Sequence, residues 1–237
     1  MEVASLYREP EATAARVAPA LEMLDVFRIF SSGPVETVAL RGLSIEVAPG
    51  EMVTVMGPSG SGKSTFLHLA AGLDVPSAGE VRSFGRPLGR LDEDELARYR
   101  SHAIAIIFQS ANLWPILTAQ ENVETSLRLA GADDVRGRAT AALAAFGLAE
   151  RGRHRVSALS GGEQQRVAIA AAAAREAPLV LADEPTGELD AGNEQIVLDA
   201  LRRLRDDHGA TVVIVTHSPR LASAADRVIE LRDGKAA

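Results

Sequence analysis

Residues 57–65 of this chain read Gly57-Pro58-Ser59-Gly60-Ser61-Gly62-Lys63-Ser64-Thr65, directly after the apolar run 52–56. They fit the pattern G-x-x-x-x-G-K-[ST], in which backbone amides surround phosphate oxygens, the lysine reaches the β and γ phosphates and the hydroxyl ligates Mg²⁺. We therefore predict that the whole loop binds a nucleotide, that Lys63 acts in phosphate transfer and that Ser64 is a metal ligand. The pattern requires a buried strand before the loop and a helix behind it, and we expect these over 52–56 and 63–71.

The chain after the loop predicts an α/β protein. Apolar runs typical of strands at 104–108, 179–182, 211–215 and 227–231 alternate with helical patterns, of which the clearest are 160–175 and 194–207. This alternation favours a mostly parallel sheet with helices on both faces. With the phosphate loop, it predicts the P-loop NTPase (RecA-like) fold class.

Two regions depart from that alternation. Short β-type runs between residues 21 and 51, interrupted by Ser31-Ser32-Gly33-Pro34, predict an N-terminal antiparallel β subdomain. An α-helical subdomain is predicted to be inserted at about 110–160. Residues 1–20 are rich in Ala, Glu and Pro, and we expect a flexible N-terminal tail followed by one ATPase domain over 21–237.

The composition excludes several classes of protein. The chain has 237 residues, a net charge of −7 and no cysteine. The negative charge gives no overall field that would attract nucleic acid, so no nucleic-acid partner is expected. No apolar run approaches the roughly 20 residues of a membrane span, and the first residues do not resemble a secretory signal. We therefore expect a cytoplasmic location.

Polar side chains follow three of the expected strands. Asp183 and Glu184 follow the strand at 179–182, His217 follows the strand that starts at Thr211, and Gln109 follows Phe108. The carboxyl ends of parallel strands meet at one edge of a sheet, beside the phosphate loop. Two carboxylates can there divide metal binding and general-base catalysis. An Asp-Glu pair can also simply end a strand, and a lone histidine is more often structural, but the upstream loop favours catalysis.

A second motif narrows the class of ATPase. Leu159-Ser160-Gly161-Gly162-Glu163-Gln164-Gln165-Arg166 resembles the LSGGQ signature of ATP-binding cassette (ABC) ATPases, and the resemblance covers the chain from about residue 21 onward. Backbone amides at such a glycine-rich helix start favour an anion, although an ordinary N-cap at Ser160 explains the same residues locally. The resemblance implies that a second copy of the chain completes the ATP site through four residues, Ser160, Gly161, Gly162 and Glu163.

The same resemblance implies a role for each strand-end residue. Asp183 would hold Mg²⁺, Glu184 would act as general base on the attacking water, and His217 would be the switch histidine near the γ phosphate. Gln109 would be the Q-loop glutamine that contacts the metal or the water. Phe30 would stack on adenine where the family usually carries tyrosine, with Phe27 as a competing candidate and core packing as the alternative for both.

The resemblance also implies partners. Segments such as Thr118-Ala119-Gln120-Glu121-Asn122-Val123 look most like the LolD, MacB and FtsE group, whose members drive lipoprotein release, efflux or envelope remodelling through an integral membrane permease. We expect a homodimer that closes over two Mg-ATP and docks on such a permease near Gln109–Val123, at the inner face of the cell membrane. Trp114, Ile116 and Leu117 would form an apolar docking patch, although each is equally consistent with the core.

Two other classes of function remain to be weighed. A soluble ABC-type ATPase acting on nucleic acid needs long coiled coils, for which the interval from Lys63 to Ser160 leaves no room, and the ribosomal type carries two cassettes. A small-molecule or nucleotide kinase would explain the phosphate loop. It would not explain the motif from Ser160 to Arg166.

Overall fold

A computed structural model describes residues 17–32, 35–110 and 112–237. Most of the predicted tail, residues 1–16, lies outside the described residues. The fold begins at Ala20, which is buried and donates its backbone N–H to the carbonyl of Val47 at 2.9 Å. Among the described residues, no helix combines the length and the apolar character needed to cross a bilayer.

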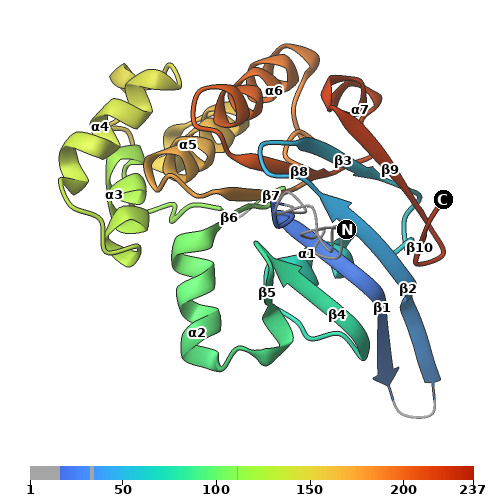
Figure 1. The fold of residues 1–237 in the computed structure, drawn as a ribbon. Coiled ribbons are helices and arrows are strands. Elements are labelled where there is room, and N and C mark those ends of the chain that lie inside the picture. The colour runs from blue at the N-terminus through green and yellow to red at the C-terminus, as the bar shows by residue number, and fades with distance from the viewer. Residues whose placement is uncertain (1–16, 33–34, 111) are drawn as a thin grey trace, which may run out of the picture.

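The central sheet has the strand order β10-β9-β3-β8-β7-β6, and all neighbouring pairs are parallel except β9 and β10. This confirms the expected parallel sheet (Figure 1). Its strands are β3 (Met52–Met56), β6 (Ile104–Ile107), β7 (Leu179–Asp183), β8 (Thr211–Val215), β9 (Arg227–Arg232) and β10 (Lys235–Ala236).

Helices cover both faces of this sheet because its strands are apolar on both sides. In β7, Val180 and Ala182 pack with α5 and α6, whereas Leu179 and Leu181 pack against α1 and the antiparallel sheet. The helices are α1 (Lys63–Ala70), α5 (Gly161–Ala174), α6 (Ala191–Asp206) and the short α7 (Pro219–Ala224).

The two N-terminal strands form the expected antiparallel pair, and two strands that follow α1 and were not predicted extend it to a sheet in the order β2-β1-β4-β5. Its long hairpin, bulged at several points, positions the upper wall of the site described below. The strands are β1 (Leu21–Ser32), β2 (Val35–Val47), β4 (Ala78–Ser83) and β5 (Arg86–Pro87). A 3₁₀ turn (Leu88–Arg90), α2 (Glu93–Arg98) and a π-helical turn (Tyr99–Ala103) then lead into β6.

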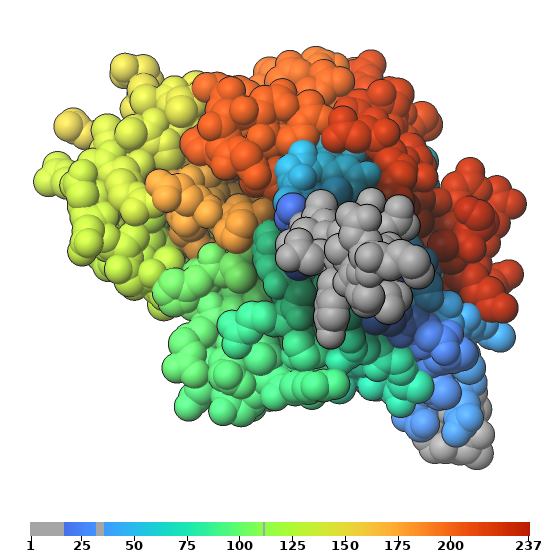
Figure 2. All heavy atoms as spheres, viewed as in Figure 1, coloured from blue at the N-terminus to red at the C-terminus, as the bar shows by residue number. Residues whose placement is uncertain are grey.

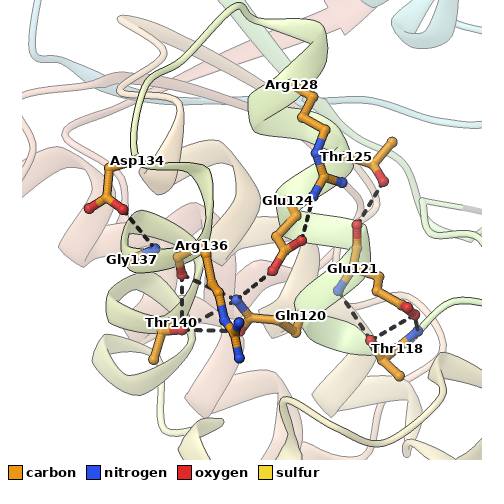
Figure 3. Close-up of polar contacts among 10 residues, drawn as sticks. All are labelled: Thr118, Gln120, Glu121, Glu124, Thr125, Arg128, Asp134, Arg136, Gly137 and Thr140. Carbon is orange, nitrogen blue, oxygen red and sulfur yellow. Dashed lines mark hydrogen bonds and ion pairs between the residues drawn. The ribbon is translucent and has the colours of Figure 1, made fainter.

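The inserted helical subdomain, residues 112–158, forms a lobe at one side of the molecule (Figure 2). It contains α3 (Ala119–Leu129), α4 (Val135–Ala145) and the 3₁₀ turns Ala149–Arg151 and Val156–Ala158. Thr118 and Glu121 form a capping box at the start of α3. Gln120 reaches across to α4, where its Nε2 donates to the hydroxyl of Thr140 at 3.2 Å and to the carbonyl of Arg136 at 3.3 Å (Figure 3). Other contacts, such as Glu124 with Arg128, join neighbouring turns of one helix.

Candidate functional site

An open cleft of about 670 Å³ lies between the phosphate loop, the end of β7 and the β2 segment 37–39. Lys63 donates from Nζ to the carbonyls of Gly57 and Pro58, at 2.8 and 3.0 Å, and so lies across the loop. Gly62 has φ +103°, and a Cβ there would lie 2.6 Å from the carbonyl oxygen of Ala39. Glycine at this position lets the loop turn sharply into α1.

The two strand-end carboxylates lie side by side at the floor of the cleft. Burial and the neighbouring Glu184 carboxylate raise the pKa of Asp183, while the nearby His68 and Lys63 oppose this rise. Glu184 has φ +44°, a left-handed conformation that is uncommon for a residue with a side chain. Its backbone N–H donates to the carbonyl of Val215 at 2.8 Å, which fixes the turn against β8. Strain of this kind concentrates at functional sites.

Both carboxylate oxygens of Glu184 have partners. Oε1 lies 2.8 Å from Nδ1 of His217, and Oε2 accepts from the hydroxyl of Thr216 at 2.8 Å and from the backbone N–H of His217 at 3.3 Å. His217 also lines the cleft. The structure therefore brings together the predicted base and the predicted switch histidine.

Gln109 lines the same cleft and, on its other side, a cavity of about 270 Å³ bordered by the start of α5. Its carbonyl accepts from Nε2 of Gln165 at 2.7 Å, and the same amide nitrogen donates to the carbonyl of Phe108 at 3.1 Å. Asn112 adds two hydrogen bonds to the backbone of Phe108. The link between the sheet and the helical subdomain is thus fastened to α5.

The signature residues do not line the cleft within one chain. Ser160 caps α5, and Glu163 accepts from its backbone N–H at 2.9 Å, which lowers the pKa of Glu163. Gly162 packs so closely on Asn193 of α6 that a Cβ would lie 2.5 Å from the side-chain oxygen. The helix start is therefore well built locally, and it faces a different cavity from the one that holds Lys63.

Phe30 is the better placed of the two aromatic candidates. It is exposed and pairs across the hairpin with Thr37, which lines the cleft. The guanidinium of Arg28 lies 4.5 Å from its ring centroid and pairs with Asp74 at 2.8 Å. Phe27 is partly buried and packs near Gly42.

The oxygen donors in the cleft fit Mg²⁺. Ser64, Asp183 and Gln109 all line it, and Mg²⁺ binds through one or two carboxylates, water and substrate phosphates. Among the described residues, no cluster of three His, Asp or Glu could hold a metal by itself. The donor set therefore suits a metal that is shared with a nucleotide.

A family model described as "ABC transporter" matches residues 40–187, more than half of the chain and the segment that carries the phosphate loop, Gln109, the signature and the strand-end acids. The chain belongs to the ABC transporter family. It is an ATPase cassette of that family, as the resemblance implied.

Relatives and solved structures agree with this assignment. The chain is 45% identical over 219 residues, 92% of its length, to "Macrolide export ATP-binding/permease protein MacB" of Marinobacter nauticus, of which it spans 34%. It is 44% identical to an uncharacterized ABC transporter ATP-binding protein of Thermotoga maritima, with 91% of this chain and 92% of that protein covered. The dimeric cassette MJ0796 superposes with a TM-score of 0.84 at 40% identity, covering 91% of this chain and 96% of that one. A second MJ0796 dimer, described as a post-hydrolysis state bound to ADP and Pi, has a TM-score of 0.83.

Sequence reasoning missed two groups at the site. Thr216 directly follows β8, and in the sequence a threonine there looks like one more ordinary strand residue. Arg28 lies two residues before Phe30, on the same face of β1, and that period-2 spacing could have identified it.

Proposed function

We propose that this cassette hydrolyses Mg-ATP as a homodimer and thereby drives an integral membrane permease of the efflux, lipoprotein-release or envelope-remodelling type. The observation that carries the proposal is the incomplete site. One chain brings Lys63, Glu184 and His217 to the cleft, whereas Ser160, Gly161 and Gly162 do not line it. A second copy that presents the amide-rich start of its α5 to the γ phosphate would complete the site.

The proposed roles follow the positions of the side chains. Lys63 and the loop amides hold the phosphates, and Ser64, Asp183 and Gln109 hold Mg²⁺, which offsets charge on the transferred phosphoryl group. Glu184 acts as general base, with His217 beside it. Phe30 offers a ring face to adenine while Arg28 covers the other.

An apolar surface on the helical subdomain supports the proposal that a permease docks there. Trp114, Ile116 and Leu129 are 59%, 77% and 72% exposed, whereas Leu117 is only partly so. Trp114 and Leu129 border a hollow of about 220 Å³ between the subdomain and α5, floored by small residues such as Ala171. An amphipathic helix of a permease could lay its apolar face there. Such docking would hold the cassette at the inner face of the membrane.

Complementation between two inactive variants tests the shared site. Lys63→Ala removes the phosphate loop's cation, and Ser160→Arg blocks the signature. Each alone should be inactive. In a mixed dimer, the intact loop of the serine variant meets the intact signature of the lysine variant, so mixing should restore ATP hydrolysis. A mixture as inactive as its components would contradict the shared site.

The permease is tested separately by purifying the cassette from solubilised membranes. We expect a protein with several membrane spans to co-purify in stoichiometric amount with the original chain and not with Ile116→Lys. Recovery of a ribosomal or nucleic-acid complex would favour the soluble class of ABC ATPase.

A further inference from the structure

Two side chains that differ greatly in burial hold the Glu184 carboxylate. Thr216 is fully buried at the end of β8, and its backbone N–H donates to the carbonyl of Val55 at 3.1 Å. The His217 side chain is 73% exposed at the mouth of the cleft. One partner of the carboxylate is therefore fixed by the sheet, and the other is free to turn.

The hydrogen bonds around Thr216 also fix the direction of its proton. The backbone N–H of Ser218 donates to Oγ1 of Thr216 at 3.0 Å. Because Ser218 supplies a proton to that oxygen, the hydroxyl is free to direct its own proton to Oε2 of Glu184, 2.8 Å away. Ser218 is itself held, since it caps α7 and donates to Glu194 at 2.6 Å. The hydrogen bonds thus run from Ser218, the N-cap of α7, through Thr216 to Glu184.

We propose that Thr216 is a positioning residue that anchors Oε2 of Glu184, while His217 is the exchangeable partner of Oε1. This proposal rests on Glu184 being the general base. When His217 turns toward the γ phosphate, Oε1 loses its partner and takes a proton from the attacking water. The water oxygen bonds to the γ phosphorus, and the bond to the β–γ bridging oxygen breaks, with its electron pair leaving on ADP. Oε2 keeps its hydrogen bond from Thr216 throughout, so the orientation of the carboxylate does not change.

Three variants test the anchor. Thr216→Val keeps the shape of the side chain and removes the hydroxyl, and we expect kcat for ATP to fall by roughly tenfold to a hundredfold, as loss of a hydrogen bond to a charged group would give. KM for ATP should change little, because Thr216 does not line the cleft. Thr216→Ser should restore most of kcat. Thr211→Val is the matched control, since Thr211 is buried at the other end of β8 and its hydroxyl accepts from Gly50.

The outcomes separate this inference from the proposed role of Glu184. If Glu184→Gln hydrolyses ATP normally, Glu184 is not the base and both ideas fail. If Glu184→Gln is inactive but Thr216→Val matches the original chain, or serine fails to rescue, only the anchor is wrong. A loss of kcat in Thr211→Val equal to that in Thr216→Val would also overturn it.

Folding is checked in the background of Glu184→Gln. An anchor for the carboxylate has no influence on nucleotide binding once the base is gone, so adding Thr216→Val should leave ATP affinity unchanged. A large loss of ATP affinity in the double variant would show that Thr216 supports the structure of the nucleotide site and does not merely position the carboxylate. If the Thr216→Val variant does not fold, Thr216→Ala can be compared with Thr216→Ser in the same way.

Discussion

The edge of the parallel sheet and the helical subdomain use polar groups in opposite ways. At the sheet edge, Glu184 is held by residues more than 30 positions away in the chain, such as Thr216. In the helical subdomain, contacts such as Thr118–Glu121 and Glu124–Arg128 join neighbouring turns of one helix (Figure 3). Large apolar side chains of this subdomain, such as Ile116, are exposed. Long-range contacts fix atoms for chemistry, whereas local contacts stabilise a helix and leave its surface available to a partner.

The largest effect is expected from a substitution that removes the Glu184 carboxylate at the sheet edge. Glu184→Gln keeps the size of the side chain but cannot accept the water proton, so ATP turnover should fall by about 10²–10⁴-fold, the usual worth of a general base. Phosphate release measures turnover, and a nucleotide-dependent dimer on gel filtration shows that ATP still binds. Glu150→Gln, at an exposed 3₁₀ turn far from the cleft, is the control and should behave as the original chain. Turnover close to normal in Glu184→Gln would show that Glu184 is not the general base.

The next prediction alters only the helical surface. Ile116→Lys places a charge in the apolar patch, and we expect recovery of the membrane partner to fall at least about tenfold, as for an interface residue worth more than 1.4 kcal/mol. ATP turnover of the isolated cassette should stay within about twofold, because a surface substitution distant from the cleft changes little. Leu73→Lys, another exposed apolar position outside the subdomain, is the control. Equal loss of the partner in both variants would place docking elsewhere.

A smaller effect follows from the lysine content. Lys63 and Lys235 are the chain's two lysines. Because ATP phosphates would cover the Nζ of Lys63, saturating Mg-ATP should slow reductive methylation of Lys63 severalfold while Lys235 reacts at its original rate. Peptide mass spectrometry gives both rates in one sample. Equal protection of the two lysines would indicate a general change rather than occupation of the loop.

The last prediction concerns stability, and not activity, and tests the packing of Tyr99 behind the sheet edge. Burial raises the pKa of Tyr99 to about 12, and its hydroxyl donates to the carbonyl of Ala70 at the end of α1. Since the unfolded chain releases this proton near pH 10, the tyrosine contribution is complete below pH 10 and is lost as the pH rises through 12. The stability advantage of the original chain over Tyr99→Phe should therefore shrink by on the order of 2 kcal/mol between pH 9 and pH 12. Urea unfolding measures it, and a constant difference would contradict the buried state.

Sequence alone predicted the parts of this molecule that depend on element order. The parallel strands and the inserted helices were predicted from their sequence patterns, whereas β4 and β5 were not. The meeting of Glu184 with His217 follows from parallel topology, because the ends of parallel strands share an edge. Ser160 could be separated from the cleft only through the family resemblance. The capping box of Thr118 and Glu121 was readable as T-x-x-E. The hydrogen bond from Thr216 to Oε2 of Glu184 could not be predicted from the sequence, since it depends on the left-handed backbone conformation of Glu184.

The turn at Gly234 joins the phosphate loop to the hairpin. Its backbone N–H donates to the carbonyl of Ser61 at 3.1 Å, and its own carbonyl accepts from Arg41 at 2.9 Å. A Cβ on Gly57 would lie 2.2 Å from the carbonyl oxygen of Leu231 in the neighbouring strand. During synthesis, the nascent polypeptide exposes residues 57–65 long before this buttress leaves the ribosome. The phosphate loop can therefore make these backbone contacts only after translation has passed Gly234.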